Sequence, residues 1–117
     1  MNSTYERDDA GVDHDALRST VGRARRLYSA EMQPAAVAEV TRELHSHLRM
    51  LVPICLAMVE QTPKHTLARR RLEAAVDTAQ HLMGTSPSGG PMAALVHMQL
   101  LADSAAALAA RVQAPQT

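Results

Sequence analysis

The chain has 117 residues, the length of one domain, and its 12 basic and 12 acidic residues give a formal net charge of zero. This balance excludes the broad positive field with which many proteins attract nucleic acid. Two tyrosines and no phenylalanine or tryptophan leave few of the residues that favour strands. The single cysteine, Cys55, excludes an intrachain disulfide and fits a reducing compartment. The composition therefore predicts an all-α protein with an aliphatic core.

The first twelve residues are polar and acidic and show no helical period, so we expect a mobile tail over residues 1–12. They contain no apolar stretch of the kind found in a signal peptide. The longest uninterrupted apolar run, from Met50 to Val59, is too short to cross a bilayer. The sequence therefore predicts a cytoplasmic protein that does not engage a membrane.

The first helix is predicted over residues 14–31. Asp13 is placed to cap it, and Asp15 in the first turn faces the positive end of its dipole. The helix should end before Gln33, because Pro34 disfavours a helical conformation in the residue that precedes it. Its apolar stripe is narrow and has helical spacing: Leu17, Val21, Ala24 and Tyr28.

The second helix is predicted over residues 35–61, with Pro34 at its first turn. Pro53 lies inside it and removes one backbone hydrogen bond, so we expect a kink there. A break into two helices is the alternative, which is less favoured because Val52 would be a poor N-cap. Apolar residues recur every seven positions, which favours packing at a shallow angle. These positions are Val37, Leu44, Leu51 and Met58.

The third helix is predicted over residues 63–83. Thr62 is interpreted as its N-cap and Pro63 as its first residue. Gly84 follows its last residue, where a left-handed backbone conformation commonly ends a helix. Its apolar stripe is His65, Ala68, Leu72, Ala75 or Val76, Ala79 and Leu82.

Gly, Ser and Pro residues make a linker of 84–91, and Pro91 opens a fourth helix over residues 91–112. The last residues, 113–117, are predicted to be a disordered tail. Four helices of about twenty residues joined by short loops predict an antiparallel four-helix bundle, with a single domain over residues 13–112.

The second half of the second helix and nearly all of the fourth helix lack a polar face. A helix that is apolar all round must be covered all round, whereas a four-helix monomer normally covers one face of each helix. This surplus of apolar surface predicts a partner protein, most simply a second copy across a two-fold axis. The alternative is that the first helix or the 84–91 loop covers it. The candidate interface residues are Met50, Val52, Leu56, Val59, Val96 and Leu100.

Two acid–histidine pairs stand at helical spacing, Glu43 with His47 and Asp77 with His81. On neighbouring antiparallel helices, two such pairs could converge on one ion. Diiron bundles instead use Glu-x-x-His, a three-residue step that is absent here. We therefore expect surface ion pairs and one partly buried histidine, His47, with no metal or other cofactor.

Arginines gather in two places and are the candidates for an anion-binding patch. The clusters have no aromatic neighbours or helix-turn-helix spacing, so we expect solvated side chains that pair with local acids such as Glu73, and no nucleic-acid partner. The candidate residues of this patch are Arg23, Arg26, Arg69 and Arg70.

No catalytic set is recognisable. Cys55 lies among apolar residues, which raise the pKa of a thiol and make it inert. The glycine-rich stretch 84–91 lacks the lysine of a phosphate-binding loop and follows a helix rather than a strand. The sequence therefore favours a protein that is not an enzyme.

Residues 44–53, LHSHLRMLVP, resemble a family of small actinomycete proteins of unknown function, some of which are loosely labelled natural-product biosynthesis proteins. In those proteins a His-Leu-x-x-Leu-x-Pro core precedes an alanine-rich helix, a Gly/Pro linker and a last alanine- and leucine-rich helix. The likeness covers residues 35–112. It implies an actinobacterial, cytoplasmic helical protein and supplies no catalytic residue. His47 and Pro53 carry over only as structural marks of the family.

The leading hypothesis is a non-enzymatic helical interaction module, accessory to secondary metabolism, that self-associates or binds a partner protein through the second and fourth helices. A second hypothesis is a small helical enzyme or ligand carrier, with a site between helices around His47 that also uses Glu43 or His81. A third is a weak polyanion binder that acts through the arginine clusters.

Overall fold

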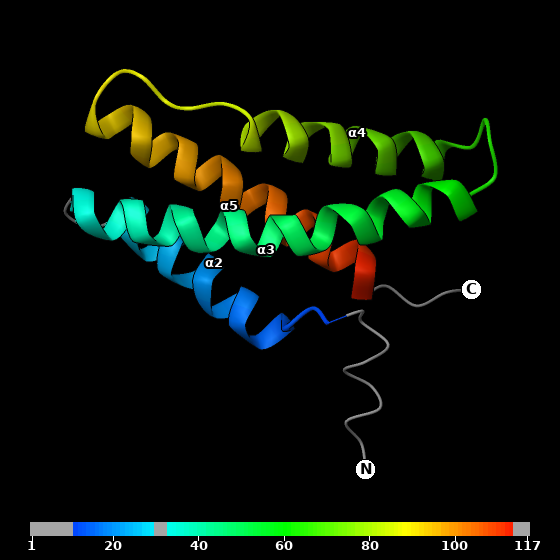
Figure 1. Ribbon diagram of the computed structural model, residues 1–117, viewed down its shortest axis with the longest axis horizontal. Helices are drawn as coiled ribbons and strands as arrows, with labels where there is room; N and C mark the ends of the chain where they lie inside the picture. The colour runs from blue at the N-terminus through cyan, green and yellow to red at the C-terminus, as the bar shows by residue number, and fades with distance from the viewer. Residues whose placement is uncertain (1–10, 30–32, 114–117) are drawn as a thin grey trace, which may run out of the picture.

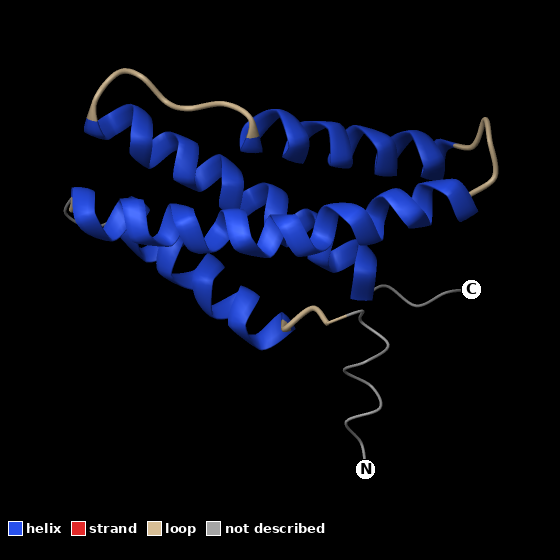
Figure 2. Cartoon of the chain, in the orientation of Figure 1, coloured by secondary structure: helices blue, strands red, loops and turns tan. Residues whose placement is uncertain are grey.

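The computed structural model describes residues 11–29 and 33–113, which form four α-helices and no strand (Figures 1 and 2). The predicted all-α class is confirmed. The predicted tails fall largely on residues 1–10 and 114–117, and the predicted end of the first helix falls on 30–32; these lie outside the described residues. The helices are α2 (His14–Ser29), α3 (Pro34–Gln61), α4 (Leu67–Met83) and α5 (Pro91–Gln113).

Helices α3 and α5 form the centre of the bundle, because each contacts all three other helices. Helices α2 and α4 flank this pair and, over the described ranges, do not contact each other. Figure 1 shows α2 below the central pair and α4 above it, with each helix running opposite to the one before it in the chain. The body is flat, with extents of 43 × 39 × 19 Å. This order is that of the predicted antiparallel bundle.

The start of α2 has the cap predicted from the sequence. The Asp13 carboxylate accepts a hydrogen bond of 3.0 Å from the backbone N–H three residues later, which satisfies one of the free donors of the first turn. Leu17, Val21 and Ala24 are buried as expected. Val12, which the sequence assigns to the tail, is also buried, so the packed domain includes it.

Helix α3 runs for 28 residues through Pro53 without interruption, so the alternative of two separate helices is wrong. Pro53 lies on the exposed side of α3. Because proline has no N–H, the carbonyl four residues earlier loses its helical hydrogen bond, and water can donate a hydrogen bond to it instead. The kink expected at Pro53 stays a prediction. The buried side chains follow the predicted periodicity: Val37, Val40, Leu44, Leu48, Leu51, Val52, Cys55 and Val59.

The predicted start of the third helix is wrong by four residues. Helix α4 begins at Leu67, and its N-cap is Thr66, whose hydroxyl accepts the N–H of Arg69 at 3.1 Å. Thr62 instead ends α3, where its own N–H donates to a carbonyl of the last turn at 3.1 Å. Because α3 and α4 are antiparallel, the chain needs several non-helical residues to reverse. His65 completes that reversal with a left-handed φ of 67°.

Gly84 follows the last residue of α4 as predicted, but its φ of −90° is not left-handed, so that part of the prediction is wrong. Its N–H donates to the carbonyls of Gln80 and His81 at 3.1 and 3.2 Å, which closes the last turn without a change of hand. A left-handed glycine occurs later, at Gly90, where φ is 85° and the chain turns into α5.

Helix α5 is embedded among the other three helices, which absorb much of the apolar surface that the sequence assigned to a partner. Among the described residues it is the one helix long and apolar enough to cross a membrane, and half of its apolar window is buried inside the protein. Its small alanine side chains let neighbouring backbones approach closely. The buried residues are Leu95, His97, Met98, Leu101, Ala102, Ser104, Ala105, Leu108 and Ala109.

Candidate functional site

Three large apolar side chains protrude from one face of α5, and we call them the α5 row. Met92, Val96 and Leu100 are 58%, 43% and 46% exposed. Their spacing of four residues places them one above another on the helix. No Asp, Glu, Lys or Arg occurs from Pro91 to Ala102, so no charge interrupts the row. Val96 and Leu100 are predicted interface residues, and Met92 extends them at the same spacing.

The four interface candidates on α3 divide into two kinds. Met50 and Leu56 are 45% and 43% exposed, whereas Val52 and Val59 are buried in the core. The prediction is wrong for these two valines because α3 contacts three helices, which widens its buried arc beyond one stripe. Met50 and Leu56 are six residues apart, about 240° around a helix, so they point to different sides. Helix α3 therefore offers no counterpart to the α5 row.

A polar contact between α2 and α3 centres on the buried Thr20, and we call it the Thr20 cluster. The Thr20 hydroxyl lies 3.2 Å from a carboxylate oxygen of Glu43, 3.1 Å from Nε2 of His47 and 3.0 Å from the carbonyl of Ala16. Arg23 of α2 forms an ion pair with Glu43. These side chains border an open hollow of about 380 Å³. Glu43 and His47 therefore lie on the same side of α3, as their spacing predicts, and both contact Thr20 of α2.

The charges of the Thr20 cluster are already matched. The hydrogen bond from Arg23 lowers the pKa of Glu43, and burial lowers the pKa of His47 against the opposing charge of Glu43. At neutral pH the cluster holds a carboxylate, a guanidinium and a neutral imidazole. Each of these groups has a partner inside the cluster, which is the pattern of a contact that holds two helices together.

The second predicted pair, Asp77 and His81, lies exposed on α4. The Thr20 cluster joins α3 to α2, and α2 and α4 do not meet, so the two acid–histidine pairs do not converge. In the part of the chain that the structure describes, no group of three or more His, Cys, Asp or Glu side chains is placed to hold a metal ion.

The two arginine clusters also stay apart, because one lies on α2 and the other on α4. Arg23 is paired across to α3, and Arg26 is exposed on α2. Arg69 donates through Nε to Glu73 at 3.3 Å and through its terminal nitrogen to the carbonyl of Thr62 at 2.9 Å. The local pairing predicted with Glu73 is confirmed, and no joint basic patch forms from these clusters.

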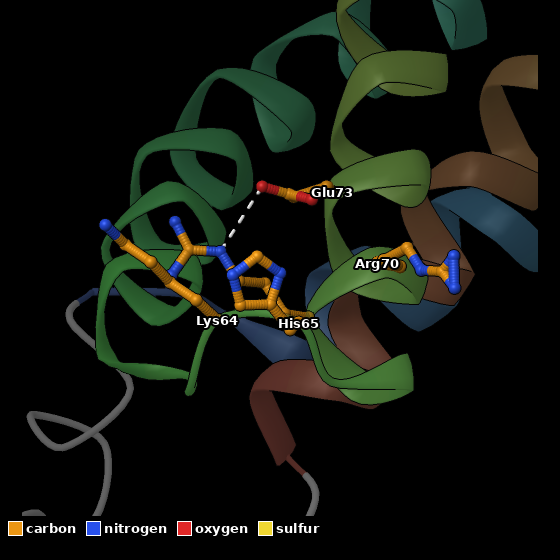
Figure 3. Close-up of a pocket in the computed structure, with 5 residues that line it drawn as sticks. Lys64, His65, Arg70 and Glu73 are labelled. Atoms are coloured by element: carbon orange, nitrogen blue, oxygen red, sulfur yellow. Dashed lines mark hydrogen bonds and ion pairs between the residues drawn. The ribbon is translucent and has the colours of Figure 1, made fainter.

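A hollow of about 480 Å³ at the start of α4 is lined by Lys64, His65, Arg69, Arg70 and Glu73. Figure 3 shows the Lys64 side chain extending away from the His65 ring, with Arg70 on the opposite side of that ring. Glu73 contributes a carboxylate to the same hollow, where it pairs with Arg69. This hollow is a poor anion site, because its cationic side chains point in different directions and the Glu73 carboxylate repels an anion. The sequence singled out neither Lys64 nor His65 as an anion-binding candidate, since their place follows from the turn before α4.

Cys55 is fully buried, as predicted, and its Sγ atom lies 4.0 Å from the carbonyl oxygen of Leu108. Burial raises the pKa of the thiol, so the reactive thiolate is disfavoured. Cys55 is therefore a core side chain and not a nucleophile.

A cavity of about 300 Å³ that sequence reasoning missed lies between the first turns of α3 and α5, beside the loop that precedes α5. Thr41, Arg42 and His97 supply its polar groups. The His97 ring is 6.5 Å from the ring of His45, and burial lowers the pKa of both histidines. The sequence feature that could have pointed to this cavity is His97, a lone histidine within an apolar helix. The apolar lining residues are Pro34, Val37, Ala38, Pro87, Pro91 and Ala94.

The described residues define an all-α fold of four helices. Residues 9–117 match the model of a family described as "Family of unknown function (DUF6415)". The chain belongs to this family. The uncharacterised family implied by the resemblance is thereby confirmed, while an actinomycete source and a role in natural-product biosynthesis stay expectations. No curated protein and no solved structure matches the chain.

Proposed function

We propose that this protein is a non-enzymatic helical interaction module that self-associates through the α5 row. The observation that carries the proposal is the exposure of Met92, Val96 and Leu100 along one face of one helix. Single exposed apolar side chains are ordinary on soluble proteins. A row at a spacing of four residues is instead the pattern by which a helix docks onto an apolar partner.

The α5 row is complementary to itself. Met92 and Leu100 each lie four residues from Val96, so a two-fold axis at Val96 pairs Met92 of one copy with Leu100 of the other, at both ends. Asp103, the first charged residue after the row, lies exposed beyond Leu100. In this arrangement it stays outside the apolar centre and keeps its solvation.

The dimer should be weak. Two rows of three side chains bury less surface than the roughly 1,200 Å² at which standard interfaces begin. Small interfaces of this kind are typical of transient encounters, so we expect a dissociation constant in the micromolar range.

The test compares two matched substitutions, Val96→Glu and Leu56→Glu, which place a charge at side chains that are each 43% exposed, on α5 and on α3. Sedimentation velocity across a micromolar concentration series should show the wild type approaching twice the monomer mass. The Val96→Glu variant should remain monomeric, and the Leu56→Glu variant should behave as the wild type. Far-UV circular dichroism and thermal melting check that both variants are folded.

Three outcomes contradict this proposal. A wild type that stays monomeric removes self-association. Disruption by Leu56→Glu and not by Val96→Glu places the contact on α3. Binding of the wild type to zwitterionic lipid vesicles, lost in Val96→Glu, would assign the α5 row to a membrane surface instead of a second copy.

The proposed cytoplasmic setting follows the expectation from the sequence, and the proposed accessory role in secondary metabolism rests on the resemblance alone. The alternative of an enzyme or ligand carrier around His47 has weaker support, because the groups of the Thr20 cluster already bond to one another. The polyanion alternative is weakened by the separation of the arginine clusters on α2 and α4.

A further inference from the structure

We propose that the cavity between the first turns of α3 and α5 binds a small apolar carboxylate. Its hydrocarbon body lies against the apolar wall, and its carboxylate is held by Arg42 and His97. The site does not depend on the α5 row and adds a ligand to the proposed function.

The size and lining of the cavity set the class of ligand. Its volume of about 300 Å³ is at the lower end of the range for small-molecule pockets, roughly 300–1,000 Å³. Among the described residues, most of its wall is proline, valine and alanine, and Thr41, Arg42 and His97 supply the polar groups. Such a site holds a short aliphatic or aryl chain with one polar end, and it is too small and too apolar for a nucleotide.

His97 is the polar group that points to a ligand. It is 7% exposed and lines the cavity. Its described neighbour is the ring of His45, and no described residue gives it a hydrogen bond. An oxygen atom of a ligand in the cavity would bond to a ring nitrogen of His97.

The electrostatics favour an anion. The cavity borders the first residues of both α3 and α5, Pro34 and Pro91, but Arg42 and His97 lie beyond these first turns, so the charge that attracts the carboxylate comes from Arg42 and not from the helix dipoles. Neither helix has an acidic residue in its first turn, and the Gln33 side chain makes no capping hydrogen bond at α3. Arg42 supplies a full positive charge, and none of the lining residues that the structure describes is acidic.

The experiment titrates the full chain with hexanoate and, in parallel, with 1-hexanol, which has the same hydrocarbon length and no charge. Binding is followed by the NMR resonances of the His97 ring and by calorimetry. Hexanoate should shift the His97 resonances to saturation and bind at least tenfold more tightly than 1-hexanol. That factor is what loss of one charged hydrogen bond would produce.

Arg42→Gln and Arg49→Gln are matched variants, because both arginines are exposed on α3 and only Arg42 lines the cavity. Arg42→Gln should weaken hexanoate binding at least tenfold, and Arg49→Gln should leave it within about twofold. A third variant, Ala94→Leu, fills the cavity and should abolish binding while circular dichroism shows an intact helix content.

Several results overturn the proposal. One is the absence of any His97 shift with hexanoate up to its solubility limit. Equal affinity for hexanoate and 1-hexanol, or equal loss in Arg42→Gln and Arg49→Gln, removes the carboxylate recognition. Undiminished binding to Ala94→Leu places the ligand outside the cavity.

Discussion

Replacing Thr66 with alanine removes the N-cap of α4. The Thr66 hydroxyl accepts the N–H of Arg69 at 3.1 Å and donates to the carbonyl of Pro63 at 2.8 Å. Loss of a threonine N-cap costs about 1 kcal/mol, and the exposed Pro63 carbonyl can bond to water instead. We therefore expect the free energy of unfolding to fall by about 1 kcal/mol and the melting temperature by about 4 °C in a domain of this size.

The matched control is Thr62→Ala, because the sequence pattern alone assigns the capping role to Thr62. In the structure its hydroxyl donates to the carbonyl of Met58 at 2.7 Å, inside the last turn of α3, and its side chain caps no free N–H. Such a bond adds little to helix stability, so Thr62→Ala should change the free energy of unfolding by less than about 0.5 kcal/mol. Urea denaturation followed by circular dichroism measures both variants.

The amide of Arg69 supplies a second measurement, since its hydrogen exchange should accelerate in Thr66→Ala and not in Thr62→Ala. The reasoning is refuted if Thr62→Ala is the more destabilising substitution, or if Thr66→Ala is neutral. Either result would mean that α4 starts at the earlier threonine, as the local pattern suggests.

Two further predictions follow from the buried titratable groups. Burial lowers the pKa of His45, His47 and His97 below 6.5, so unfolding takes up protons in mildly acidic solution. The free energy of unfolding should fall as pH drops from about 7 towards 5, by at most ~1.4 kcal/mol per pH unit for each histidine. Glu43, whose pKa is lowered by the hydrogen bond from Arg23, adds a further loss only below pH 4.5. Urea titrations at several pH values test this, and a stability that rises on acidification would contradict it. For Cys55, burial and the raised pKa predict that a thiol reagent at neutral pH labels it only as fast as the protein opens, while full labelling in urea is rapid. Fast labelling of the native protein would show that Cys55 is not in the core.

Local signals in the sequence fixed the helix starts that depend on one or two residues. Asp13 caps α2 through its own carboxylate, and Pro34 and Pro91 open α3 and α5 because a proline needs no hydrogen-bond partner there. Thr62 and Thr66 are equally good caps as isolated residues. The choice between them depends on how many residues the chain needs to reverse between two packed helices, which no local pattern contains.

The candidate site was predictable in part. The alignment of Val96 with Leu100 and of Glu43 with His47 on one side of a helix follows from helical spacing, which brings residues four apart together whatever surrounds them. The partners of Glu43 come from α2 instead of α4, and that depends on which helices touch.

The sequence by itself determined that the chain is helical, where most of its apolar stripes lie and that Cys55 is a core residue, because composition and period act along the chain. Only the tertiary structure decided that α3 and α5 share the centre of the bundle. That placement buried Val52 and Val59, left the α5 row exposed and brought His97 to a cavity, since burial depends on neighbours that are distant in sequence.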